Sequence, residues 1–323
     1  MRGLRSGCAA AILILGTALL SGCTDTSQEN KEAYKTIGIH AYEAGDYKEA
    51  VDAFDKALAQ ANGVVTMDEA DICFYKARAL FRDGKKKKAL AVYDALLDLD
   101  SSLNEAYFLR GSVKLSMGKD EEAMEDFREA IRRDPKNIEL YIAVYDNLRE
   151  AGKEEEGKEF LQGATEISGS KASDHTLRGR AFMLLGNYEG ARDELLNGAE
   201  KNDDEALLYL GELYSLEGDQ ATAKNYYSEY LALHEEDAGA LNVLVCYSME
   251  NEDYEQALTY FDQALEYSES SGIDPQEILR NRILCLEYLE RFEDAELALE
   301  EYLQFYEPDE VLTREGVFLD TRV

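Results

Sequence analysis

Eight consecutive segments of about 34 residues repeat one spacing of small and aromatic side chains between residues 31 and 309. The clearest segment starts at Asn104 and carries Gly111, Gly118, Ala123 and Phe127. A repeat of this length holds two helices and a turn, and it buries its apolar face only by stacking on its neighbours. The period therefore predicts an all-α array of helical hairpins, with units that start at residues 31, 70, 104, 138, 172, 204, 238 and 276.

Small residues recur in both helices of each hairpin, where they allow the two backbones to approach closely. In the first helix they are Gly38, Ala77, Gly111, Gly179 and Gly211, and in the second they are Ala50, Ala89, Ala123, Ala191 and Ala223. A further glycine ends the first helix in six units, since glycine adopts the left-handed C-cap conformation at little cost. These glycines are Gly45, Gly84, Gly118, Gly152, Gly186 and Gly218. The seventh unit has Val245 and Glu252 at the two glycine positions, and the eighth has Ile283 and Glu290.

The whole pattern resembles the tetratricopeptide repeat (TPR), over about residues 31–309. The resemblance implies a right-handed superhelical solenoid of about eight helix-turn-helix repeats. Residues 310–323 are shorter than a hairpin and are expected to form a C-terminal capping helix. In that helix Val311, Leu312, Phe318 and Leu319 would cover the last hairpin.

The N-terminus has the pattern of a processed leader. Arg2 and Arg5 precede an apolar run that is too short to span a bilayer, which needs about 20 residues. The run ends in Leu20, Ser21, Gly22 and Cys23, which resembles a bacterial lipobox. We expect a lipoprotein signal peptide over 1–22, and a lipidated Cys23 with a short tether over 23–30; an ordinary secretory signal is the alternative.

Two acyl chains on Cys23 would anchor the protein to a membrane without spanning it. The expected location is therefore extracytoplasmic, on the outer face of the plasma membrane or at the outer membrane of a Gram-negative cell. Of the other cysteines, we expect Cys73, Cys246 and Cys285 to be buried thiols. A Cys246–Cys285 disulfide is the open alternative.

Residues for catalysis or metal binding are scarce. His40, His175 and His234 fall in different units, and none has the spacing of a metal-ligand motif. No phosphate-binding glycine loop is present, so we expect no enzyme activity and no cofactor or metal. The formal charge of −33 also argues against nucleic acid as a partner, because phosphate backbones repel such a chain.

Binding is the function that the resemblance implies. In the family, positions 2, 5, 9, 12 and 13 of the first helix of each unit face ligands along a concave groove. The corresponding candidates for a peptide-binding groove are Tyr42, Phe74, Arg78, Phe81, Arg82, Phe108, Ser112, Leu115 and Arg180. Aromatic and arginine side chains are the usual anchors of binding hot spots. The alternative is that Phe74, Phe81 and Phe108 only pack between neighbouring helices.

The sequence therefore predicts a membrane-anchored scaffold that binds a protein or peptide, with assembly of the cell envelope as the expected process. A receptor for a small envelope-derived ligand, such as a glycan or lipid fragment, is the alternative.

Charge is distributed unevenly along the array. Residues 70–137 sum to +1, whereas residues 204–309 sum to −23 and contain twelve of the 21 tyrosines. The lysine run 85–88 is interpreted as a solvated turn, with contact to anionic lipid as the alternative. We expect the acidic half to project away from an anionic membrane and to meet a basic or cation-rich partner.

Overall fold

The computed structural model describes residues 26–61, 66–271 and 275–322, and the regular structure within these ranges is entirely helical. The predicted signal peptide 1–22, with Leu20, Ser21 and Gly22, and the predicted lipid attachment site Cys23 lie outside the described residues. The expectation of an all-α repeat solenoid is confirmed. The chain divides after Ala130 into two compact units, each described by itself below.

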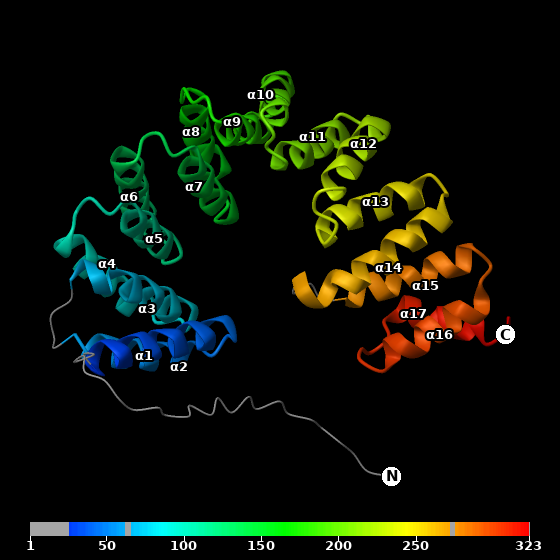
Figure 1. The fold of residues 1–323 in the computed structure, drawn as a ribbon, viewed down its shortest axis with the longest axis horizontal. Helices are drawn as coiled ribbons and strands as arrows, with labels where there is room; N and C mark the ends of the chain where they lie inside the picture. The colour runs from blue at the N-terminus through cyan, green and yellow to red at the C-terminus, as the bar shows by residue number, and fades with distance from the viewer. Residues whose placement is uncertain (1–25, 62–65, 272–274, 323) are drawn as a thin grey trace, which may run out of the picture. The chain divides into compact units, whose positions relative to one another are not determined.

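The first unit is a series of helical hairpins, in which successive helices pack side by side (Figure 1). Its elements are α1 (Thr26–Glu43), α2 (Tyr47–Ala59), the 3-10 turn η1 (Met67–Glu69), α3 (Ala70–Arg82), α4 (Lys86–Leu99), α5 (Asn104–Leu115) and α6 (Asp120–Arg133), the last of which crosses the division.

The second unit continues the same hairpin pattern and ends in a single short helix (Figure 1). Its helices are α7 (Ile138–Glu150), α8 (Glu154–Thr165), α9 (Ala172–Leu184), α10 (Tyr188–Glu200), α11 (Glu205–Leu216), α12 (Gln220–Leu231), α13 (Ala238–Glu250), α14 (Tyr254–Ser271), α15 (Gln276–Tyr288), α16 (Phe292–Leu303) and α17 (Glu310–Leu319). The odd-numbered helices up to α15 are the first helices of the hairpins and are called A helices below; their even-numbered partners are called B helices.

Close packing inside each hairpin depends on the small residues of the A helices. A methyl group added at Gly111 would lie 2.8 Å from the ring of Phe127, and one added at Gly38 would lie 2.5 Å from the ring of Phe54. Both rings are fully buried, as are the small residues beside them on the B helices. The glycine therefore leaves the space that the aromatic ring of the B helix fills, which is why these two residue types recur at a fixed separation.

The turns between the helices of a hairpin share one backbone conformation, including the two turns that lack glycine. Gly84 has a φ of 75° and Gly218 a φ of 84°, whereas Glu252 and Glu290 occupy the same left-handed region with φ values of 58° and 57°. The amide of Arg291 donates to the carbonyl oxygen five residues earlier, as the corresponding amide does in the glycine turns. The hairpin geometry thus imposes the left-handed conformation whatever side chain is present.

The joint between the first and second hairpins is held by a buried ion pair. Lys31 Nζ lies 2.7 Å from Glu69 Oε1, and both side chains are less than a tenth exposed. The amide and hydroxyl of Thr66 also donate to the Glu69 carboxylate. These hydrogen bonds, that with Lys31 first, lower the pKa of Glu69 to about 2. The joint therefore ties α1 to the start of α3.

Helix α1 begins earlier than the sequence pattern indicates. It starts at Thr26, so residues 26–30 of the predicted 23–30 tether are helical. The hydroxyl of Ser27 donates to the carbonyl oxygen of Gln60 at 2.8 Å, which fastens the start of the helix to the end of α2. The predicted tether is correspondingly shorter.

Helix α17 packs on α16 at the C-terminal end of the second unit. Leu312 and Leu319 are each 1% exposed, and the ring of Phe318 meets that of Phe292 at a centroid distance of 5.9 Å. The Asp309 side chain caps the helix by accepting a hydrogen bond from the Leu312 amide. The apolar face of α17 thus covers the last hairpin.

Candidate protein-binding surface

Side chains at the predicted ligand positions of α1, α3 and α5 lie on neighbouring A helices of the first unit. Two ion pairs connect these helices: Lys35 on α1 bonds Asp71 on α3, and Arg78 Nη2 on α3 lies 2.5 Å from Glu105 Oε1 on α5. Each pair joins one A helix to the next, which is the geometry expected for a continuous A-helix face. We call this face, with its residues Tyr42, Phe74, Arg78, Phe81, Arg82, Phe108 and Ser112, the A-helix surface.

The aromatic residues of the A-helix surface are partly buried. Phe74 contacts the ring of Tyr93 at a centroid distance of 6.4 Å, and Phe108 contacts Phe127 at 5.9 Å. Phe81, like Phe74, packs against the buried apolar cluster that includes Tyr93. Each of these phenylalanines therefore takes part in packing and keeps some area accessible to solvent, so the two alternatives set by the sequence are not exclusive.

The arginines of the A-helix surface differ in their surroundings. The guanidinium of Arg78 pairs with Glu105 and lies 6.0 Å from the centroid of the Tyr75 ring. Arg82, at the end of α3, is exposed and has no ion-pair partner among the described residues. An arginine without an intramolecular partner can bond a carboxylate of another molecule through two parallel N–H donors.

The remaining predicted groove residues are placed less favourably. The Ser112 hydroxyl donates to the carbonyl oxygen of Phe108 at 3.1 Å, and Tyr42 packs its ring against Tyr47. Leu115 is only 8% exposed, because its side chain belongs to the packed interior. It is therefore not part of the A-helix surface.

Arg180 belongs to the second unit, on α9. Its guanidinium lies 3.3 Å from the carboxylate of Asp146 on α7 and 5.7 Å from the centroid of the Tyr209 ring on α11. It thus connects three successive A helices, and its charge is already partnered.

Carboxylates that pair with these basic groups were not among the predicted site residues. The missed residues include Asp71 and Glu105, each at the second position of its unit. The signal was available in the sequence, since acidic residues recur at this position. They are Glu32, Asp71, Glu105, Glu139, Glu205 and Glu277.

The lysine run at the start of α4 is a partly bonded turn. Lys85 pairs with Asp83 at 2.6 Å, and Lys86 donates to the carbonyl oxygen of Ser116 at 2.8 Å. Lys87 and Lys88 are exposed. Two of the four charges are therefore satisfied within the first unit.

The cysteines depart from the expectation in one respect. Cys73 and Cys285 are buried, and burial raises the pKa of both thiols, but Cys246 is exposed. All three thiols are free, so the structure contains no Cys246–Cys285 disulfide. The buried-thiol interpretation was wrong for Cys246, because its helix α13 presents that position to solvent.

Neither a metal site nor a membrane span is found in the part of the chain that the structure describes. No three His, Cys, Asp or Glu side chains gather there in a way that could hold a metal ion. Among the same residues, no helix combines the length and apolar character needed to cross a bilayer.

Repeated helical hairpins with small residues at the A–B contact define a repeat solenoid of the protein-interaction type. Models described as "Tetratricopeptide repeat" match residues 5–65, 35–104, 74–138 and 242–310, and another of the same description matches residues 205–236. These matches cover more than half of the chain, which therefore belongs to the tetratricopeptide repeat family.

Curated relatives resemble the chain over part of their length. It is 25% identical over 269 residues to "TPR repeat-containing protein YpiA" of Bacillus subtilis (strain 168), covering 79% of this chain and 61% of that protein. It is 26% identical over 198 residues to "DnaJ homolog subfamily C member 7 homolog" of Dictyostelium discoideum, covering 60% of this chain and 36% of that protein. The chain thus spans less than two thirds of the length of these relatives.

Among solved structures, the hetero-tetramer Cut9–Hcn1 of the APC/C is similar, with a TM-score of 0.49 and 17% sequence identity. The match covers 87% of this chain and 54% of that one.

Proposed function

We propose that the protein is a lipid-anchored, extracytoplasmic scaffold that binds a protein or peptide through the A-helix surface of its first unit. The observation that carries the proposal is the exposed guanidinium of Arg82, without an ion-pair partner among the described residues, on the same helix α3 as the partly exposed rings of Phe74 and Phe81. Arginine and aromatic groups in one patch are typical anchors of protein interfaces. The surface suits a peptide or helix that carries acidic and aromatic side chains.

The anchor is supported by the sequence Leu20-Ser21-Gly22-Cys23 alone. Metabolic labelling with palmitate tests it directly. We expect the wild-type protein to take up the label and a Cys23→Ala variant to lose it. A variant that retains the label would refute lipidation at this residue.

Binding through the A-helix surface is tested by cross-linking on intact cells, followed by mass spectrometry. We expect an Arg82→Ala variant to lose most of the dominant cross-linked partner, corresponding to about a tenfold weaker complex, or about 1.4 kcal/mol. Arg82 is a better target than Phe74, whose truncation would also remove its contact with the Tyr93 ring.

Arg128 provides the matched control. It is an exposed arginine in the first unit without an ion-pair partner among the described residues, but it lies on the B helix α6. An Arg128→Ala variant should capture the partner as well as wild type. Equal capture by both variants, or an equal loss in both, would remove the A-helix surface from the proposal.

A further inference from the structure

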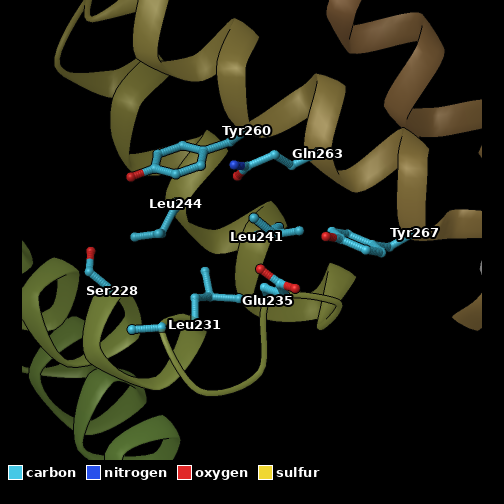
Figure 2. Close-up of a pocket in the computed structure, with 9 residues that line it drawn as sticks. Ser228, Leu231, Glu235, Leu241, Leu244, Tyr260, Gln263 and Tyr267 are labelled. Atoms are coloured by element: carbon cyan, nitrogen blue, oxygen red, sulfur yellow. The ribbon is translucent and has the colours of Figure 1, made fainter.

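A pocket in the second unit lies between α12, α13 and α14, and none of its lining residues belongs to the A-helix surface. Figure 2 shows Tyr260 and Gln263 of α14 on one side and Leu231 on the other, with Leu241 and Leu244 of α13 between them. The cavity measures about 270 Å³. This is room for one long side chain rather than for a folded segment.

The base of the pocket is apolar and its walls are aromatic. Leu231, Leu241 and Leu244 are each less than a tenth exposed. Tyr260 and Tyr267 are partly buried, and both project from α14 into the lining (Figure 2). Leucine side chains can pack against the aliphatic stem of a lysine or arginine, and the faces of tyrosine rings attract its cationic group.

A carboxylate completes the lining. Glu235 lies in the connection between α12 and α13, is exposed, and has no hydrogen-bond or ion-pair partner among the described residues. Figure 2 shows its carboxylate between Leu231 and the hydroxyl end of Tyr267. The pKa of Tyr267 is raised, first by loss of solvent and then by the charges of Glu235, Glu266 and Glu236. The opening of the pocket is therefore strongly negative.

None of the described residues that line the pocket is a lysine or an arginine. Between residues 220 and 271 the sequence has eleven carboxylates, one lysine, Lys224, and no arginine, and the one histidine, His234, lies 3.3 Å from the Asp204 carboxylate. Lys224 lies 5.1 Å from the centroid of the Tyr247 ring and does not line the pocket. On the neighbouring helix α15, Arg282 pairs with Asp262. The Glu235 carboxylate is thus left for a cation from outside.

We propose that this pocket binds the side chain of a lysine or arginine presented by a partner polypeptide, with its stem on the leucines and its charge between the tyrosine rings and Glu235. The inference rests on the proposed role in protein binding but concerns a different surface. It agrees with the expectation that the acidic half of the chain meets a basic partner.

Saturation-transfer difference NMR tests the proposal, because it detects weak binding from the signals of the peptide. The full-length protein in detergent is titrated with a blocked peptide of one arginine flanked by glycines. The comparison peptide carries citrulline, which keeps the shape but lacks the charge. We expect saturation of the arginine methylenes, and binding about fivefold or more weaker for the citrulline peptide.

Substitutions localise the effect. Glu235→Gln should weaken binding of the arginine peptide about threefold to tenfold. Glu266 is an exposed acid on α14 that does not line the pocket and reaches Tyr267 only through its charge, so Glu266→Gln should weaken binding much less. Tyr267→Leu should also weaken binding, with folding checked by circular dichroism. If the Tyr267→Leu variant unfolds, the comparison of Glu235→Gln with Glu266→Gln still decides the test.

The proposal is overturned by no binding of the arginine peptide, by equal binding of the citrulline peptide, or by equal effects of Glu235→Gln and Glu266→Gln. Agmatine, a free alkylguanidine, tests the source of the cation, since tighter binding of agmatine than of the peptide would reject a polypeptide ligand. None of these outcomes bears on Arg82, so failure here is distinguishable from failure of the A-helix surface.

Discussion

Two hairpin turns of the second unit hold a glutamate where the other turns hold glycine, and replacing it should stabilise the protein. Glu252 and Glu290 have φ values of 58° and 57°, a region in which the Cβ atom crowds the following carbonyl oxygen. Both side chains are exposed and make no hydrogen bond or ion pair within the described residues. Substitution by glycine therefore removes backbone strain without removing a contact.

The expected gain follows from two opposing quantities. A non-glycine residue in the left-handed conformation is destabilised by about 1–2 kcal/mol. Glycine loses more backbone entropy than glutamate on folding, which offsets about 0.5–1 kcal/mol of the stability gained by relieving this strain. Each substitution, Glu252→Gly or Glu290→Gly, should thus raise the free energy of unfolding by about 0.5–1 kcal/mol. In a chain of this size that shift amounts to roughly 2 °C in Tm.

Thermal unfolding followed by far-UV circular dichroism measures the effect. A Glu290→Gln variant is the matched control, because it removes the charge from an acidic region but keeps a side chain on the strained backbone. It should gain much less than Glu290→Gly. Conversely, Gly218→Ala should lower Tm, since Gly218 has a φ of 84°. The reasoning fails if glycine at position 290 gives no more stability than glutamine, or if Gly218→Ala has no effect.

Two further predictions concern packing and pH. Gly111→Ala should destabilise the first unit by about 1 kcal/mol, because the added methyl would meet the buried Phe127 ring. This cost should exceed the gain from the better helix propensity of alanine. Increased stability in chemical denaturation would contradict the prediction. Burial and the neighbouring Glu315 charge raise the pKa of Glu287 from 4.5 to about 7, so its contribution to stability is full below pH 4.5 and is lost as the pH rises through 7. Glu287→Gln should therefore raise the free energy of unfolding at pH 8 by on the order of 1 kcal/mol after solvent screening, and change it little at pH 4.5, as followed by chemical denaturation. A pH-independent effect would contradict the assignment.

Local pattern was sufficient to predict the helices. The 34-residue period predicts unit starts at 70, 104, 138, 172, 238 and 276, and an A helix begins at each of these residues. This succeeds because the positions of glycine, alanine and the aromatic residue record direct contacts within one hairpin. The buried Phe127 against Gly111 is such a contact, made over sixteen residues of chain.

The candidate site was less predictable, because burial depends on which helix packs against which. Sequence position alone assigned the same role to Arg82, which is exposed, and to Leu115, which is 8% exposed. It also treated Cys246 as buried, although α13 exposes it. These outcomes are set by contacts between hairpins, whose angles are not recorded in the spacing of any single repeat.

The sequence by itself determined the hairpin class of the protein, the register of the repeats and the acidic character of residues 204–309. Only the tertiary structure showed that Glu252 and Glu290 adopt the conformation of glycine, because the hydrogen bonds that close each turn fix its backbone regardless of the side chain. Only the tertiary structure, likewise, brought Glu235 beside Tyr260 and Tyr267. These residues lie on separate elements, and the packing of α12, α13 and α14 alone decides that they line one cavity.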